Sequence, residues 1–244
     1  MVSKNQIKRI ISLQQKKYRK ESGLFFVEGK KVIQELLDSK FVLEELFVTE
    51  PLFEHIPQQT LISESDLKKI SALTNPNNSL AVFRMPEPKK INEGGIILAL
   101  DKIRDPGNLG TIIRLCDWFG ITDLVCSEDT VDLYNPKVLQ ATMGSITRVN
   151  VSYVNLNVFL TETKLPVFGT FMEGKNLYKS QLPQKGIIVM GNEANGISPE
   201  IEQLITDKIT IPRFGNPTES LNVATATAIV LSEFRRSLKE ITHN

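Results

Sequence analysis

Residues 96–126 read IILALDKIRDPGNLGTIIRLCDWFGITDLVC, in which two short apolar runs flank a helical pattern. The runs, 96–100 and 123–126, have the length and composition of buried strands. The apolar residues between them recur at helical spacing and predict one core-facing side: Ile112, Leu115, Cys116 and Phe119. A strand, a helix and a second strand in this order are typical of a parallel α/β sheet.

The helix within this stretch is expected to begin with Asn108 as its N-cap and to stop at Gly120. Arg114 projects from the side opposite the apolar residues, one turn after Gly110. A cation above a residue without a side chain has room to touch a ligand or a second subunit. From spacing alone, a solvated arginine is the favoured explanation.

The alternation continues after this stretch. Further strands are expected at 148–153, 167–171, 187–190 and 208–211, which predicts a mostly parallel sheet covered on both faces. Ligands bind such sheets beyond the carboxyl ends of the strands. Those ends carry Asp101, Thr170, Gly191 and Pro212.

A smaller α/β unit precedes this sheet. Its expected strands are 24–27, 46–48 and 80–83, and its expected helices are 30–37 and 65–71. Prolines, charges and paired glycines at 86–95 indicate a linker. The expected organisation is therefore a first domain at 1–85, a linker at 86–95 and a second domain at 96–244.

The second chemistry-bearing segment, residues 187–198, reads IIVMGNEANGIS. A buried strand runs into a loop bracketed by glycines, where backbone amides can approach a ligand closely. Ser198 as cap and Pro199 at the first helical position predict a helix start. The alternative is a tight turn in which the carboxylate of Glu193 is incidental.

The third segment, residues 211–224, reads IPRFGNPTESLNVA and leads into an expected helix at 225–240. Glu219, Ser220 and Asn222 crowd its start, where free N–H groups and the helix dipole attract anions. Simple capping by Ser220 or Asn222 is the alternative. Three alanines keep the helix slim and suggest close packing, which a second subunit could provide: Ala224, Ala226 and Ala228.

Composition restricts the class of protein. The chain has 244 residues, a net charge of +1 and 41% hydrophobic residues, as ordinary soluble domains do. No apolar run is long enough to span a membrane, and the polar N-terminus is not a secretory signal. Cys116 and Cys126 lack Cys or His neighbours, which indicates buried thiols in a reducing compartment and no metal site. A cytoplasmic location is expected.

The positive charge gathers at the N-terminus. The first 31 residues hold nine Lys or Arg, among them the cluster Lys16, Lys17, Arg19 and Lys20. Such a face fits contact with a phosphate backbone. A solvated amphipathic helix, with Ile7, Ile10, Ile11 and Leu13 as its apolar stripe, explains the pattern equally well.

Taken together, the patterns N-x-G-x-x-x-R, G-N-E-x-x-G and E-S-L-N-V resemble the three signature motifs of the SpoU (TrmH) family of RNA 2′-O-ribose methyltransferases. The resemblance covers about the last 150 residues. Residues 25–29, FFVEG, also resemble the family's N-terminal substrate-binding domain, which has a ribosomal-protein-like α/β fold.

The resemblance implies a trefoil-knotted catalytic domain, S-adenosylmethionine as cofactor, and a homodimer with its site at the subunit interface. The absence of G-x-G-x-x-G agrees, because it argues against a Rossmann cofactor site. The implied catalytic residues are Asn108, Arg114, Glu193, Ser220 and Asn222. The implied cofactor-binding backbone lies at Thr170, Gly191, Ile211 and Leu221. The family proposal makes the arginine a base, whereas its pKa above about 12 favours a phosphate clamp.

Two departures and three alternatives remain at this point. Ala224 stands where the family commonly has serine, and the 211–221 stretch is one residue longer than usual. The alternatives are a non-catalytic RNA-binding protein, a base-methylating knotted enzyme, and transfer RNA in place of the favoured ribosomal RNA.

Overall fold

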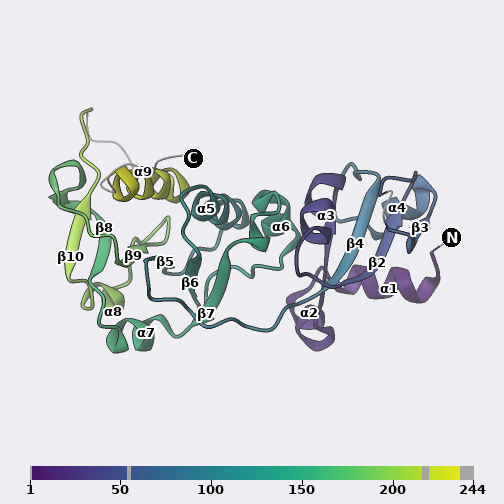
Figure 1. Ribbon diagram of the computed structural model, residues 1–244, viewed down its shortest axis with the longest axis horizontal. Helices are drawn as coiled ribbons and strands as arrows, with labels where there is room; N and C mark the ends of the chain where they lie inside the picture. The colour runs from purple at the N-terminus through teal and green to yellow at the C-terminus, as the bar shows by residue number, and fades with distance from the viewer. Residues whose placement is uncertain (1, 54–55, 216–219, 237–244) are drawn as a thin grey trace. The chain divides into compact units, whose positions relative to one another are not determined.

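The computed structural model describes residues 2–53, 56–215 and 220–236 (Figure 1). The chain forms two compact units, each built around its own sheet. Unit 1 comprises Met1–Pro88 with Asp132–Thr147, and unit 2 comprises Lys89–Val131 with Arg148–Asn244. Within the described ranges no helix is both long and apolar enough to cross a membrane.

Unit 1 contains a four-stranded mixed sheet in the order β1-β4-β2-β3. Its strands are β1 (Leu24–Glu28), β2 (Leu43–Val48), β3 (Gln59–Leu61) and β4 (Ser79–Arg84). Its helices are α1 (Lys4–Ser12), α2 (Lys16–Ser22), α3 (Lys30–Leu37), α4 (Glu64–Ile70) and α6 (Pro136–Thr142), with a 3-10 turn η1 (Ser145–Thr147). Every strand and helix expected before residue 85 is present, and β3, which is short and largely polar, was not expected.

The two faces of this sheet bury different residues because side chains alternate along a strand. Leu24 and Phe26 of β1 pack in one cluster with residues of α1 and α4, such as Ile10 and Leu67. Helix α3 packs against β1 and β4 and buries Val32, Ile33 and Leu36. The sheet of unit 1 is therefore covered on both faces.

The N-terminal basic segment is not a uniform charged surface. Lys16, Lys17 and Lys20 are exposed, but Arg19 is only 2% exposed. The guanidinium of Arg19 donates to the carbonyl oxygens of Leu13 (2.8 Å) and Gln14 (2.9 Å) and pairs with Asp132. The expectation that Arg19 belongs to an exposed basic cluster is therefore wrong, because a buried cation needs such partners to be stable.

Unit 2 contains a six-stranded sheet in the order β10-β8-β9-β5-β6-β7, and all its strand pairs are parallel. The strands are β5 (Ile96–Leu100), β6 (Asp123–Ser127), β7 (Asn150–Val154), β8 (Val167–Asn176), β9 (Gly186–Met190) and β10 (Asp207–Thr210). The helices are α5 (Pro106–Trp118), α7 (Leu156–Glu162), α8 (Pro199–Glu202) and α9 (Val223–Arg236), with a 3-10 turn η2 (Leu177–Lys179). The prediction of a parallel α/β sheet is confirmed.

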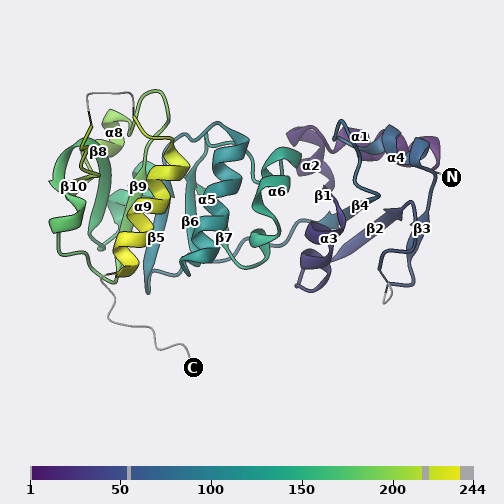
Figure 2. The same cartoon turned by 90° about the horizontal axis from the view of Figure 1, so that it is seen from above.

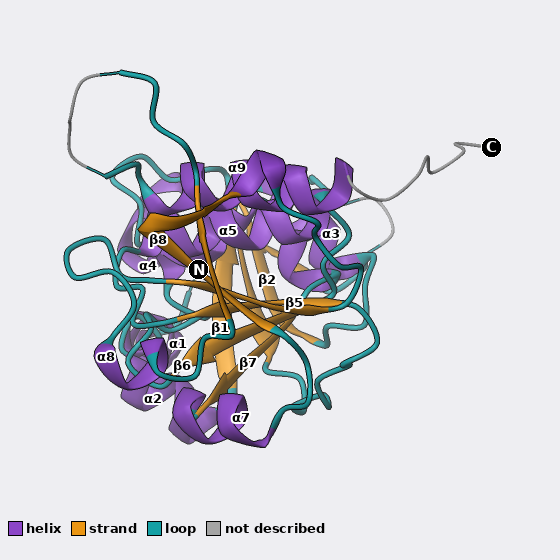
Figure 3. Cartoon of the chain, turned by 90° about the vertical axis from the view of Figure 1, so that its left-hand side faces the viewer, coloured by secondary structure: helices purple, strands orange, loops and turns teal. Residues whose placement is uncertain are grey.

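Helices cover both faces of this sheet. Helices α5 and α9 lie side by side over one face, and α7 and α8 lie over the other (Figures 1, 2 and 3). On the second face Ile97, Val125 and Val189 of the strands pack with Leu160 of α7 and Ile201 of α8. This core fixes the strand ends from which the loops of the next section project.

Helix α5 begins earlier than expected. Its N-cap is Asp105, whose side chain accepts from the Asn108 N–H at 2.7 Å, and Pro106 occupies the first turn. The expectation of Asn108 as N-cap is wrong because Asp-Pro supplies a better start. The side-chain amide of Asn108 is therefore free for other contacts. The end of the helix is as expected, with Gly120 at φ +64°.

The exposure pattern of α5 follows the predicted periodicity only in part. Ile112 and Cys116 are fully buried, whereas Leu115 and Phe119 are half-buried and Ile113 is buried in addition. The reason is that α5 packs against both the sheet and α9, so residues on two sides of the helix are buried.

The other two predicted helix starts are both found. Ser198 and Pro199 open α8, although the Ser198 side chain makes no capping hydrogen bond. The side chain of Asn222 accepts from the N–H groups of Ala224 (2.9 Å) and Thr225 (3.2 Å), which makes it the capping residue of the last helix. Residues 237–240 of the predicted helix lie outside the described residues.

Candidate active site

A cavity of about 780 Å³ opens at the carboxyl ends of β8, β9 and β10. This volume suits a cofactor-sized ligand. The cavity is lined by all four residues expected to bind the cofactor, Thr170, Gly191, Ile211 and Leu221. Two of the expected catalytic residues, Glu193 and Ser220, line it as well. Three segments distant in sequence thus meet around one space.

The loop after β9 is closed on itself. Asn192 and Gly196 exchange two backbone hydrogen bonds of 2.9 Å each, and Gly196 has φ +68°. A Cβ on Gly191 would lie 2.2 Å from the carbonyl carbon of Gly196, so no side chain fits at that position. The glycine therefore leaves backbone exposed along the cavity wall, and Glu193 is exposed in the loop.

The end of β5 holds this loop at both of its ends. The Asp101 carboxylate accepts from the Ser198 N–H at 2.7 Å, and the Lys102 carbonyl accepts from the Asn192 side-chain amide at 2.6 Å. Lys102 has φ +58°, a left-handed conformation that costs a non-glycine residue about 1–2 kcal/mol. The sequence marked Asp101 as a strand end, but nothing in it marked the carbonyl of Lys102 as a loop contact.

Asn108 connects the three signature segments. Its side-chain N–H donates to Glu193 Oε1 at 2.7 Å, and its Oδ1 accepts from the Asn222 amide at 2.9 Å. Because Asn222 uses its own oxygen to cap α9, its nitrogen is left to donate to Asn108. The orientation of both amides is thereby fixed, and Asn108 must present its donor to the carboxylate. We call this Asn222–Asn108–Glu193 arrangement the polar relay.

Arg114 is the one expected catalytic residue that the structure leaves apart. It is exposed on α5 and does not line the cavity. Within the described part of the chain it makes no hydrogen bond or ion pair. Trp118, one turn later, is 84% exposed. An exposed guanidinium beside an exposed indole forms a surface suited to a further molecule.

Several residues of the cavity were not expected from the sequence. Phe171 and Met172 add apolar wall, and Glu173 adds a carboxylate. Lys208 lies over the Phe171 ring, 4.9 Å from its centroid, and pairs with Glu202. These positions follow no motif, since Phe171 of β8 and Lys208 of β10 meet only through the pairing of the two strands.

The cavity suits an organic cofactor better than a metal ion. It combines apolar side chains with exposed backbone at Gly191, which is the lining that nucleoside-sized ligands use. Among the residues that the structure describes, no group of three or more His, Cys, Asp or Glu is placed to hold a metal. The polar relay then supplies hydrogen-bonding groups at the edge of the same cavity.

Comparison with known proteins assigns this architecture. The SpoU rRNA Methylase family model matches residues 95–232, and the MRM3-like substrate binding domain model matches residues 4–81. The 23S rRNA (guanosine(2553)-2′-O)-methyltransferase RlmP of Bacillus subtilis is 31% identical over 96% of this chain and 97% of its own length.

Solved structures agree with the family models. A TrmH-family protein from Porphyromonas gingivalis has a TM-score of 0.90 at 40% identity and covers 97% of this chain and 99% of its own. An AdoMet-bound rRNA methyltransferase from Sinorhizobium meliloti has a TM-score of 0.84 at 28% identity, with 98% of both chains covered. This chain therefore belongs to the SpoU rRNA methylase family.

Proposed function

We propose that this chain transfers a methyl group from S-adenosylmethionine to a ribose 2′-hydroxyl of ribosomal RNA. The observation that carries the proposal is the polar relay, which joins one residue from each signature segment at the edge of the cavity. A non-catalytic binding protein has no need of that arrangement. Relatives from Bacillus subtilis and Neisseria meningitidis bear the name of 23S rRNA 2′-O-methyltransferases, which favours ribosomal over transfer RNA.

S-adenosylmethionine supplies a methyl group on a positively charged sulfur, ready for attack by an oxygen nucleophile. Backbone at Thr170, Gly191, Ile211 and Leu221 would hold it, since all four residues line the cavity. We expect binding without a metal ion, to be checked by calorimetry with a chelator present. Binding that appears only on addition of a divalent cation would contradict this assignment.

The reaction would form a bond between the 2′-oxygen and the methyl carbon, break the carbon–sulfur bond and release the hydroxyl proton to solvent water. We assign Arg114 to the developing negative charge on the oxygen and to the neighbouring phosphate, because a guanidinium stays protonated and binds phosphate through two parallel N–H groups. The Asn108 amide holds the Glu193 carboxylate in one orientation at the cavity. Ser220 also lines the cavity, and Asn222 fixes Asn108.

The active site requires a second copy of the chain in this proposal. Arg114 does not line the cavity of its own chain, and its helix exposes Trp118 in the same direction, one turn later. A homodimer would cover this apolar surface and bring a cation to the partner's cavity. Light scattering should give twice the monomer mass at micromolar concentration, and a monomer would leave the proposed site without its arginine.

We assign RNA selection to residues 1–85 and chemistry to residues 96–244. Exposed Lys16, Lys17 and Lys20 support the first assignment, and the position of the cavity supports the second. Residues 132–147 cluster with unit 1 and form part of its structure. Deleting residues 1–85 should therefore abolish site choice while exposing part of that segment. Unchanged RNA affinity and site choice would contradict the division.

Two further features are inferred from the family. We expect the catalytic domain to be knotted, which agrees with the meeting of segments 191–197 and 220–223 around one cavity. We also place the protein in the cytoplasm, where ribosomal RNA would be its substrate.

The function is tested by incubating the purified protein with radiolabelled S-adenosylmethionine and either ribosomal or transfer RNA. Nuclease digestion and chromatography then separate 2′-O-methylnucleosides from base-methylated ones. We expect label in a 2′-O-methylnucleoside of ribosomal RNA. Label in a base, in transfer RNA alone, or in no RNA would each contradict the proposal.

A further inference from the structure

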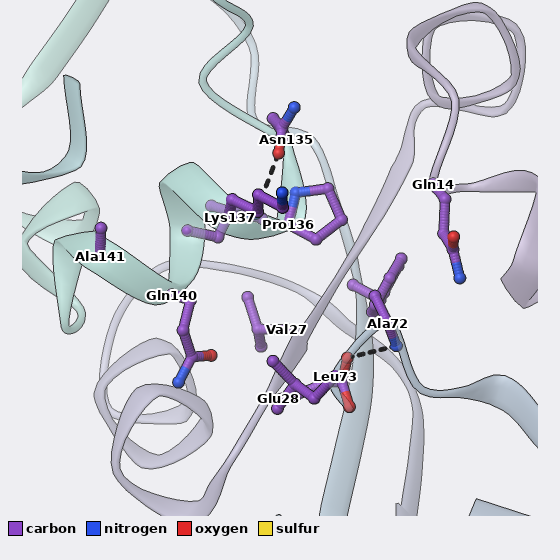
Figure 4. Close-up of a pocket in the computed structure, with 12 residues that line it drawn as sticks. Gln14, Val27, Glu28, Ala72, Leu73, Asn135, Pro136, Lys137, Gln140 and Ala141 are labelled. Carbon is purple, nitrogen blue, oxygen red and sulfur yellow. Dashed lines mark hydrogen bonds between the residues drawn. The ribbon is translucent and has the colours of Figure 1, made fainter. Parts of the chain in front are cut away.

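Unit 1 contains a second cavity, of about 480 Å³, that the proposed chemistry does not use. Figure 4 shows its lining. The lining residues come from the segment after α1, the end of β1, the segment after α4, and α6: Gln14, Phe26, Val27, Glu28, Ala72, Leu73, Asn135, Pro136, Lys137, Leu139, Gln140 and Ala141. All of them belong to unit 1.

The walls of this cavity combine apolar surface with two glutamine side chains. Phe26, Leu73 and Leu139 supply apolar surface. Figure 4 shows Gln14 on one side of Glu28 and Leu73, and Gln140 on the other. Within the described residues neither glutamine side chain has a hydrogen-bond partner. A partly open apolar space with glutamine amides at its sides is suited to a planar, polar-edged ligand.

Glu28 adds a fixed carboxyl group to the lining. Only 4% of the residue is exposed, and burial raises the pKa of its carboxyl group. One oxygen accepts from the Ala72 N–H at 2.8 Å, and the other accepts from the Ser71 hydroxyl. Each carboxylate oxygen can accept two hydrogen bonds, so one acceptor site on each oxygen remains.

Exposed lysines follow the cavity residues in sequence. Lys137 lines the cavity itself, Lys16 and Lys17 follow Gln14, and Lys30 and Lys31 follow Glu28. Among the described residues, Glu21 is an acidic partner of these lysines, with its Oε1 3.9 Å from Lys17 Nζ. This pair is exposed and contributes little to stability. This charge favours an occupant that carries phosphates.

We propose that the unit 1 cavity binds an unstacked guanine base of the RNA substrate, with the lysines contacting the flanking phosphates. Single-stranded RNA offers bases whose pairing edges are free for such binding. Guanine presents two adjacent donors, N1–H and the 2-amino group, to the two acceptor sites of Glu28. Adenine, cytosine and uracil lack that pair of donors. The proposal rests on RNA being the substrate, as inferred above.

The test measures fluorescence anisotropy of labelled oligouridine with one central guanosine, inosine or uridine, added to the full-length protein. Wild type should prefer guanosine over uridine by about tenfold, the discrimination of one good bidentate contact, and inosine should fall between them. Ala141→Phe fills the cavity and Gln140→Ala removes an amide. Ala141→Phe should lose the guanosine preference because it blocks access to Glu28, whereas Gln140→Ala keeps the Glu28 acceptor sites and should only weaken that preference.

Matched controls separate the base site from general charge and from misfolding. Gln58→Ala removes an exposed glutamine of unit 1 outside the cavity and should keep the preference. Lys137→Ala should weaken all three oligomers equally. No preference in wild type, or a preference that survives in folded Ala141→Phe, would overturn the proposal. If wild type methylates ribosomal RNA without any such preference, only this inference fails; if it methylates no RNA, the proposed function fails whatever the preference.

Discussion

Two glutamates at strand ends have contrasting surroundings in the two units. Glu28, the last residue of β1, is buried and accepts hydrogen bonds from a backbone N–H and a serine hydroxyl. Glu193, in the loop after β9, is exposed and is held by the Asn108 side chain. Glu28 is held by partners from the segment after α4 within the fold of unit 1, whereas Glu193 is held by a residue of another signature segment, so its position depends on the whole site being assembled.

The largest expected effect concerns Arg114, which in the proposal completes the active site of the partner chain. Arg114→Ala should lower methyl transfer at least about a hundredfold, the lower range for a lost oxyanion or proton-transfer group. Cofactor affinity, measured by calorimetry, should change little, because the proposed cofactor contacts are backbone groups at Thr170, Gly191, Ile211 and Leu221.

Arg114→Lys distinguishes the two roles of the arginine. A phosphate clamp loses its planar pair of donors in lysine and stays inactive. A general base would survive with a shifted pH optimum. Near wild-type turnover by Arg114→Ala would exclude both roles and favour the non-catalytic alternative.

The next effect tests the polar relay. Asn108→Leu removes the donor to Glu193 and the acceptor from Asn222, so we expect about a tenfold loss of turnover, the range for a hydrogen bond to a charged group. Asn108 does not cap α5, so the thermal stability should change little. Asn155→Leu is the matched control, because Asn155 caps α7 and lines neither cavity, so it should affect folding more than turnover. Equal turnover of wild type and Asn108→Leu would remove the relay from the chemistry.

A smaller effect is expected at the positive-φ residue that holds the loop. Lys102→Val should lower the unfolding free energy by about 1–2 kcal/mol, because a β-branched residue is disfavoured at φ +58°. It should also weaken cofactor binding through Asn192. Lys102→Gly tolerates this φ and loses only the exposed pair with Glu200, so it should remain close to wild type. A urea titration that gives Lys102→Gly a lower unfolding free energy than Lys102→Val would contradict this account.

The smallest effect concerns pH and the buried carboxylate. Burial raises the pKa of Glu28 above 4.5, so the folded state binds its proton more readily than the unfolded state does. The stabilisation from that proton is full below pH 4.5 and is lost as pH rises through the raised folded pKa. Glu28→Gln should therefore make the unfolding free energy depend less on pH across this interval, as measured by denaturant titration. An unchanged slope of the unfolding free energy against pH would mean that a group other than Glu28 titrates in this interval.

Much of the fold could be predicted because the signals are local. The central strands β5 and β9 of unit 2 are nearly continuous apolar runs, and Pro199 marks the start of α8. Asn108 was assigned the wrong local role because its neighbour Asp105 competes for the cap, and only the tertiary structure shows the bonds to Glu193 and Asn222. Burial of Arg19 was equally hidden, since its partner Asp132 lies more than a hundred residues away in sequence.

Most of the site residues named from the sequence lie together in the structure, whereas Arg114 lies apart and the geometry could not be predicted. The motifs named residues that line one cavity, while the Lys102 carbonyl and the Phe171 wall carry no sequence pattern. Residues 132–147 show the same limit, because their packing with unit 1 is a long-range property. Glu219 and the Asn216-Pro217 part of the longer loop lie outside the described residues.

The central claim is most directly tested by mapping 2′-O-methyl groups across ribosomal and transfer RNA in cells with and without this protein. The account predicts that one ribosomal RNA position loses its 2′-O-methyl group in the deletion strain. Wild-type protein should restore that group, and Arg114→Ala should not. Identical maps in the two strains, or restoration by Arg114→Ala, would contradict the claim that this chain is a ribose methyltransferase.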